Sequence, residues 1–238
     1  MKKQFFWWFL SAAIGRSYAQ SDYPKQQIYG DVAVSGIGGF SAAVSYNRLY
    51  GVGNSKRFKV GGGIRLTSLF GKDLNYYTAP ARLTSGQVGP QVLFVENILA
   101  NLDTLTLTKT QTNALNLVIH LQYSFPKWDI GFNIDAAGVT LGGQQTGTFL
   151  AKSTGSRYHG TQQAAKPTLL NVLLVSDNDR GSLNSELYAR YWLTDKTGIR
   201  AGATFQFAEY TTSQPLTFEN DRFRHKTLMP FLAVSFRF

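Results

Sequence analysis

The sequence contains three histidines, the residues best suited to general acid–base chemistry near neutral pH. His120 stands shortly before Ser124 and Asp129, so a base, a hydroxyl and a carboxylate share one short region. His159 and His225 have no comparable Ser or Asp pattern beside them. Catalysis requires the base to lie within hydrogen-bond reach of a nucleophile or a water. Whether these groups meet depends on the elements that hold them.

A second group of residues offers ligands for a metal ion. The stretch Ser176–Gly181, SDNDRG, gathers side-chain oxygens of the kind that Ca²⁺ prefers. The full twelve-residue calcium-loop pattern with its closing glutamate is absent, and a surface turn is the better interpretation. The sequence has no cysteine and no CxxC, HExxH, P-loop or GxSxG motif. We therefore expect no metal and no cofactor.

The remaining charged residues alternate with apolar ones along short segments. A period of two indicates strands with one apolar and one polar face. The clearest is Asn113–Phe125, where Leu115, Leu117 and Ile119 alternate with Asn116, Val118 and His120. Eight segments fit this pattern: Ile28–Ser35, Phe40–Leu49, Arg57–Leu69, Asn113–Phe125, Trp128–Gly142, Leu183–Leu193, Gly198–Tyr210 and Pro230–Phe238. Gly36–Gly39 permits a tight turn between the first two.

The N-terminus predicts export. Lys2 and Lys3 precede the apolar run Phe5–Ile14, and Ser17-Tyr18-Ala19 fits a signal-peptidase site, so we expect residues 1–19 to be removed as a signal peptide. No later apolar run reaches the length of a transmembrane helix. In lipid, an alternating sheet must close on itself because an open edge finds no hydrogen-bond partner. The alternative is a soluble sandwich.

The fold class expected is therefore all-β: one antiparallel up-and-down transmembrane β-barrel domain spanning 20–238, with eight strands. Ten strands are the alternative. Thr168–Val175 is expected as either an additional strand or a loop helix. Thr104–Thr112 is an alternative extension of the fourth strand. The long connections Gly71–Thr112 and Gly142–Ser182 are expected outside the cell as loops, the second mobile and exposed. Within the first, Gly89–Leu102 has roughly helical apolar spacing and predicts a short amphipathic helix that caps the barrel mouth or lies on the outer leaflet.

The last segment resembles the C-terminal signal that the assembly machinery of bacterial outer-membrane barrels reads. Its apolar face consists of Leu232, Val234, Phe236 and Phe238, and the chain ends on the aromatic ring. This resemblance implies a periplasmic C-terminus and the β-barrel assembly machinery as a partner. The short connections Tyr50–Ser55, Pro126-Lys127 and Thr194–Thr197 would then also lie on the periplasmic side.

Three further stretches carry a more specific resemblance: TAPARLTSG (Thr78–Gly86), GFNIDAAG (Gly131–Gly138) and LLVSDNDRGSLNSELYARYWL (Leu173–Leu193). With the signal segment and terminal Phe they resemble small, uncharacterised outer-membrane β-barrel proteins of Bacteroidota-type bacteria. The resemblance implies the fold and the bacterial outer membrane as location, but no activity. The net charge of +10 is scattered, which favours outer-membrane lipid and lipopolysaccharide phosphates over nucleic acid as partners, with ordinary solvated surface charge as the alternative.

If the apolar faces point outward, a set of charged residues points into the lumen. These are Asp31, Lys59, Arg65, Asp129, Asp135, Glu186, Arg190, Arg200 and Arg237. Charges in a narrow lumen must pair, because an isolated buried charge costs several kcal/mol. Glu186, Arg190 and Arg200 are the most specific candidates for such a network. An eight-stranded barrel has room for little else, so we expect a plugged lumen.

The function expected is that of a structural or surface-interaction barrel acting through its external loops. A narrow channel or carrier for small solutes is the first alternative, and an outer-membrane lipid-modifying enzyme or protease is the second. We expect no enzymatic activity, because His120 would face the lumen in mid-strand, far from the rim where lipid substrates arrive.

Overall fold

The computed structural model describes residues 23–36, 39–152, 155–174 and 176–238. The expected signal peptide, residues 1–19, and the centre of the Gly36–Gly39 turn lie outside the described residues. Among the described residues, no helix has the length and apolarity needed to cross a bilayer.

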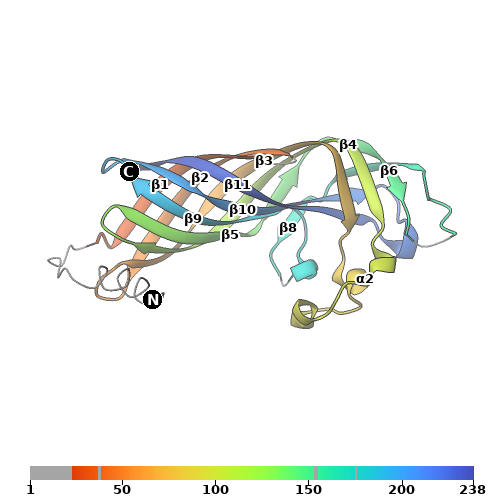
Figure 1. Cartoon of the computed structure of the whole chain (residues 1–238), viewed down its shortest axis with the longest axis horizontal. Helices are drawn as coiled ribbons and strands as arrows, with labels where there is room; N and C mark the ends of the chain where they lie inside the picture. Colours follow the sequence, from red (N-terminus) through yellow and green to blue (C-terminus); the bar gives the residue numbers. More distant parts are fainter. Residues whose placement is uncertain (1–22, 37–38, 153–154, 175) are drawn as a thin grey trace, which may run out of the picture.

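Eight antiparallel strands close into a ring, which confirms the predicted fold class (Figure 1). The ring closes where the last strand pairs with the first, Val34 opposite Leu232 and Tyr29 opposite Arg237. In order around the ring the strands are β1 (Gln26–Gly36), β2 (Phe40–Val52), β3 (Phe58–Thr78), β4 (Thr104–Ser124), β5 (Trp128–Leu141), β9 (Leu183–Trp192), β10 (Thr197–Thr212) and β11 (Arg222–Arg237).

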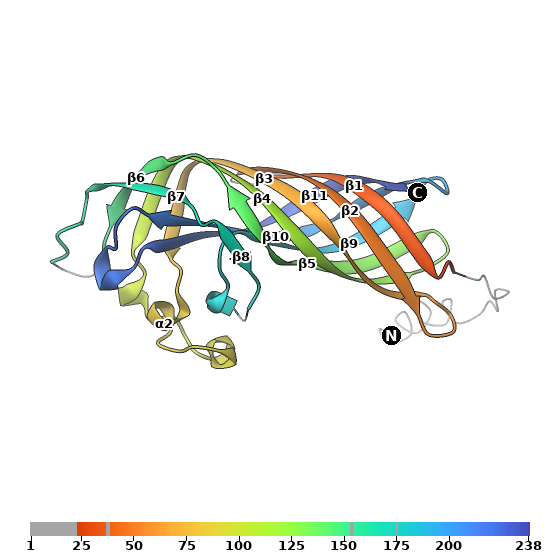
Figure 2. The same cartoon turned by 180° about the vertical axis from the view of Figure 1, so that it is seen from behind.

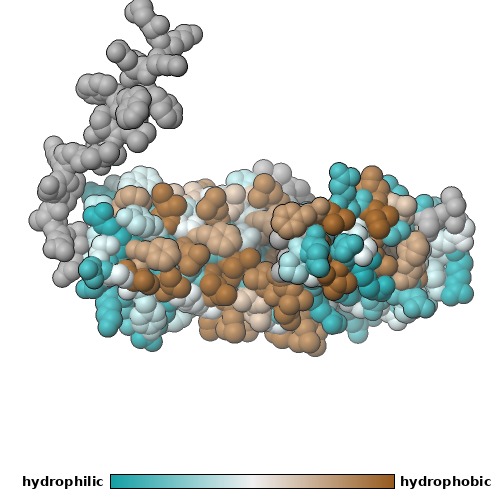
Figure 3. Space-filling view, turned by 90° about the horizontal axis from the view of Figure 1, so that it is seen from below, coloured by the Kyte–Doolittle hydropathy of each residue, from teal (hydrophilic) through white to brown (hydrophobic). Residues whose placement is uncertain are grey.

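Alternation along each strand divides the side chains between the outside and the lumen. On β4, Leu117 is 60% exposed on the outside, whereas its neighbours Asn116 and Val118 are buried. Figure 3 shows apolar side chains gathered over the outer face of the ring. The strands therefore have the in–out register that the sequence predicted.

A second ring continues from the first, at the end away from the C-terminus, here called the distal end (Figure 2). The distal ring contains the outer parts of β3, β4, β10 and β11, with β6 (Gln145–Leu150) and β7 (Gln162–Pro167) inserted between β4 and β10. It closes where β11 pairs directly with β3, Phe223 opposite Thr78. β1 and β2 stop below this ring, and β8 (Leu170–Val172) continues along β5 beside it.

The distal ring corrects both long-loop expectations. β3 runs on to Thr78 and β4 already begins at Thr104, so the predicted loop Gly71–Thr112 shrinks to the segment between those residues. The alternative in which Thr104–Thr112 extends the fourth strand is confirmed. The predicted loop Gly142–Ser182 contains β6, β7 and β8, and its Phe149 is buried rather than exposed. These strands form because the partner strands continue beyond β1 and β2.

The expected amphipathic helix Gly89–Leu102 is replaced by two 3₁₀ turns, η1 (Pro90–Phe94) and η2 (Leu99–Asn101), which follow the short helix α2 (Ala81–Thr84). Val95 and Ile98, between the two turns, both have extended backbone angles (φ −118°, ψ 137° and φ −78°, ψ 93°), so the turns do not join into one continuous helix. Two further 3₁₀ turns are η3 (Ser176–Asn178) and η4 (Thr217–Glu219).

Candidate functional site: the charged lumen and its closures

The lumen of the eight-strand ring holds seven charged side chains linked by successive ion pairs. The sequence of partners is Asp135, Arg65, Glu186, Arg200, Asp31, Arg190 and Asp129, and signs alternate at every step. The nitrogen–oxygen distances range from 2.5 Å, between Arg65 and Asp135, to 3.6 Å, between Arg200 and Asp31. We call these seven residues the lumen chain. All seven side chains are buried.

Arg190 lies next to Asp129, at the end of the lumen chain away from the distal ring. It contacts Asp31 and Asp129, each at 3.4 Å, and its Nε donates to Ser235 Oγ at 2.9 Å. The guanidinium also lies over the Tyr29 ring, 4.0 Å from the centroid. Each face and edge of this buried cation is therefore occupied, which offsets its desolvation.

Arg65 lies at the other end of the lumen chain. Its Nε and Nη2 both donate to Asp135 Oδ1, at 3.0 and 2.5 Å, and its Nη1 donates to Asn133 Oδ1 at 2.8 Å. Arg200 connects the two ends, because it lies 2.8 Å from Glu186 and 3.6 Å from Asp31.

Glu186, Arg190 and Arg200, the most specific candidates for the network, all belong to the lumen chain, but Glu186 and Arg190 are joined only through Arg200 and Asp31. Arg200 contacts Glu186, but the second cation on this carboxylate is Arg65, at 3.1 Å. Glu186 and Arg190 share one face of β9, but four residues of strand separate them by about 13 Å. Partners for a lumen side chain therefore come from other strands.

Two of the predicted lumen cations stand apart from the lumen chain. Lys59 is buried and its Nζ donates to Gln27 Oε1 at 2.7 Å. Arg237 is half-buried and stacks over Trp192 at 3.8 Å from the ring centroid. Within the described part of the chain, neither forms an ion pair with a carboxylate. Both line a cavity of about 240 Å³ at the end of the barrel opposite the distal end, and Asp129 lies in the same wall.

His120 faces the lumen, as its position on β4 predicted, but it meets no nucleophile there. Both ring nitrogens are buried and have no hydrogen-bond partner among the described residues. Ser124 accepts from Gln122, and Asp129 accepts from Arg190 and Trp192. The histidine ring instead packs edge-to-face on Tyr29, 6.4 Å between centroids. Within the described part of the chain, no base–nucleophile pair therefore forms around His120.

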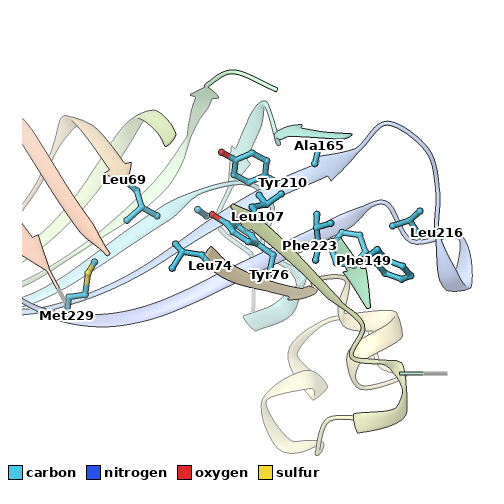
Figure 4. Close-up of a cluster of buried hydrophobic side chains, with 12 residues drawn as sticks. Leu69, Leu74, Tyr76, Leu107, Phe149, Ala165, Tyr210, Leu216, Phe223 and Met229 are labelled. Carbon is cyan, nitrogen blue, oxygen red and sulfur yellow. The ribbon is translucent and has the colours of Figure 1, made fainter. Parts of the chain in front are cut away.

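The distal ring closes the lumen a second time, with apolar side chains. Tyr76, Phe149, Tyr210 and Phe223 point toward one another from four strands (Figure 4). The rings of Tyr76 and Tyr210 meet edge-on at 5.2 Å between centroids, and those of Phe149 and Phe223 at 5.8 Å. The complete cluster comprises Leu69, Leu74, Tyr76, Leu105, Leu107, Phe149, Ala165, Ala208, Tyr210, Leu216, Phe223 and Met229.

Between the lumen chain and this distal core lies a void of about 10 Å³, lined by Thr67, Asp135, Asn184 and Gln206 among others. Such a volume holds a single water. Ion pairs therefore fill the membrane-facing part of the barrel, and a packed apolar core fills the part beyond it.

The distal end carries a second ion cluster that the sequence analysis missed. The Glu209 carboxylate accepts from Arg222 and Arg224, each at 2.8 Å. Asp177 binds Lys226 and lies 3.7 Å from Arg224. Glu209 lies within the expected strand Gly198–Tyr210, but on the face that it shares with Ile199 and Phe205, which was expected to point outward. Arg224 lies before the expected last strand, Pro230–Phe238.

This cluster also accounts for the oxygen-rich stretch Ser176–Gly181. The Asp177 carboxylate is bound by cationic side chains, and the Asp179 carboxylate accepts the amide of Leu174 at 2.6 Å. Burial raises the pKa of Asp179, against the opposing effect of that hydrogen bond. No group of three or more potential metal-ligating side chains occurs in the described residues.

Comparison with known proteins gives distant structural similarities. No family model and no curated protein matches the chain. Among solved structures, the chain is similar to Neisserial surface protein A (NspA), with 8% identity, a TM-score of 0.37, and coverage of 90% of this chain and 96% of that one. It is also similar to the Ralstonia pickettii toluene transporter TbuX, with 14% identity, a TM-score of 0.22, and coverage of 85% and 70%. A third is a Pseudomonas aeruginosa FadL homologue, at 11% identity, a TM-score of 0.22, and coverage of 83% and 68%. At these scores the similarities carry no inference about function.

Proposed function

We propose that this chain is a closed outer-membrane β-barrel that acts through its distal end as a structural or surface-interaction protein. The apolar outer face of the eight-strand ring supports a lipid-embedded location, because that face would otherwise be left in water. The distal end is proposed to be extracellular, since the connections gathered there are the longer ones, whereas the C-terminal end of β11 lies at the opposite end, paired with the start of β1.

The observation that carries this proposal is the double closure. Charged side chains in the lumen compensate one another in the lumen chain, and the distal core above them is built from packed aromatic and aliphatic groups. An aqueous path along the axis would have to break both. Transport through the barrel axis is therefore disfavoured, and the ordered distal ring becomes the part available to partners.

Partners are proposed on chemistry alone. An apolar belt suits lipid acyl chains, and the scattered basic residues suit the phosphates of lipopolysaccharide. The terminal strand, with Leu232, Val234 and Phe236 on its outer face, suits recognition by the β-barrel assembly machinery. The absence of enzymatic activity remains a prediction.

Conductance in a planar bilayer tests the closed lumen. The refolded mature chain, with insertion verified by protease protection, is expected to give no single-channel steps at neutral pH. Steady steps from folded protein would contradict the proposal and favour the alternative of a narrow channel. A variant with Tyr76, Phe149 and Phe223 all changed to alanine removes only the distal closure. We expect it to stay non-conducting, because the lumen chain still fills the barrel.

A further inference from the structure

The connection between β3 and β4 exposes an apolar segment. Phe94 is 87% exposed, Val88 68% and Leu99 67%, and Val95 and Ile98 are exposed as well. Glu96 is the single charged residue between Gly86 and Leu102. Burying apolar surface contributes about 25 cal/mol per Å², and a contiguous exposed patch of this kind marks an interaction site.

This segment is held in place by the rest of the chain. Asn178 of η3 bonds both the amide and the carbonyl of Gly89, at 3.4 and 3.2 Å. The amide of Ile98 donates to the Thr84 carbonyl at 2.6 Å, and Val92 is buried. The apolar side chains are therefore presented outward by a braced support.

The position of the segment fits a bilayer surface. In Figures 1 and 2, α2 and the turns after it project sideways from the wall, near β8, where the eight-strand ring gives way to the distal ring. β8 and its flanks also expose apolar side chains, Leu170, Val172 and Leu174. Figure 3 views the side on which the connection projects and shows apolar groups over the ring and again over this connection. The apolar outer face thus continues into the segment.

We propose that Val88–Leu99 is a membrane-surface anchor that lies in the outer leaflet, with Phe94 inserted among the acyl chains close to the headgroups. Flanking basic residues suit this arrangement, because Arg82 and Arg180 are exposed and available to lipid phosphates. The anchor would fix the depth and tilt of the barrel from one side. This inference rests on the proposed membrane location.

Nitroxide labels test the anchor, and the absence of native cysteine makes each label unique. Phe94→Cys and Val88→Cys report on the segment. Leu117→Cys reports on the outer face of the barrel, and Phe218→Cys reports on η4 in the β10–β11 connection, where the phenylalanine is 44% exposed. The full mature chain is reconstituted in phosphatidylcholine–phosphatidylglycerol vesicles. Collision rates are then measured with oxygen, which concentrates in lipid, and with a nickel chelate, which stays in water.

We expect the ratio of oxygen to chelate collisions to be several-fold higher for labels at Phe94, Val88 and Leu117 than at Phe218. A water-like ratio at both Phe94 and Val88, with a lipid-like ratio at Leu117, would overturn the anchor and leave the barrel proposal standing. Low collision rates with both agents would indicate cover by a protein partner or a second copy, and would also overturn it. A water-like Leu117 would instead refute the membrane location. Folding of each variant is verified by heat-modifiable migration.

Discussion

At the scale of single residues, the lumen is governed by how buried charges share partners. Glu186 and Asp31 each contact two arginines, whereas Asp135, at one end of the lumen chain, has Arg65 as its only cationic partner among the described residues. Removing one partner of a buried pair is strongly destabilising because it leaves an uncompensated charge. The stability of the barrel is therefore more sensitive to loss of a partner at the Asp135 end of the lumen chain than to loss of one in its middle.

Changing Arg65 to Met is expected to lower the free energy of unfolding by about 3–5 kcal/mol, since Asp135 is then left buried without a cation. Urea unfolding of the vesicle-refolded protein measures this. Arg237→Met is the matched control: it removes a cation–π contact and no ion pair, so about 0.5–1 kcal/mol is expected. Adding Asp135→Asn to Arg65→Met should recover part of the loss. Equal losses for the two single variants would contradict this account.

Membership of the lumen set was readable from the sequence, but its pairings were not. Alternation along β1 or β9 places Asp31 and Arg190 inward whatever the strand order. Whether these two residues meet depends on which strands face each other across the lumen and on the register of those strands. The alternation of apolar and polar residues gives no information about either. His120 shows the same limit, because its inward face was predicted and its packing on Tyr29 was not.

At the scale of elements, the strands divide into those that serve one ring and those that serve two. The part of β4 from Asn113 onward was predicted clearly, because Leu and Ile alternate with polar residues there. Its outer part, TLTLTKTQT, alternates more weakly and has few large apolar residues, as does β3 around Lys72 and Asp73. The distal ring was therefore missed, because its inward positions are shared among six strands that contribute one to three apolar groups each.

Changing Phe149 to Ala tests whether the distal ring is a separate packing unit. Truncating a buried Phe typically costs about 3–5 kcal/mol, and here the loss should stay local. We expect faster amide hydrogen exchange in β6 and β7 with unchanged exchange in β1 and β2, measured by mass spectrometry. Phe218→Ala, at an exposed position, should leave exchange in all four strands unchanged. Uniform acceleration around both rings would show that they form one cooperative unit.

At the scale of the whole molecule, β11 is the strand that takes part in closing both rings. It pairs with β1 near the C-terminus, with β10 along nearly its full length and with β3 at the distal end. The residue after β11, Phe238, contributes little to the folded structure, since its ring is exposed and its amide makes one backbone hydrogen bond to Ile28 at 3.0 Å.

Deleting Phe238 is therefore expected to reduce the amount of folded protein in the outer membrane without reducing its stability once folded. The reason is that the exposed terminal ring is available for recognition during assembly and is not needed for packing. Quantifying the heat-modifiable form in membrane fractions measures the first effect, and refolding the purified variant into vesicles measures the second. Normal levels in cells would remove the case for an assembly signal at this end.

Each ring is closed by its own strand pairing: β11 pairs with β1 in the eight-strand ring and with β3 in the distal ring. The two pairings differ in how far apart the paired residues are in the sequence. The eight-strand ring is closed by residues far apart in the sequence, such as Tyr29 and Arg237, whereas the distal ring is closed by Phe223 and Thr78, which are nearer in sequence. Loop-closure entropy rises with the chain length between paired residues, although only slowly. The distal ring contains no pairing with β1 or β2, so it can form before these two strands are in place. The β1–β2 hairpin would then be the last element to pair, and its pairing with β3 and β11 would close the eight-strand ring.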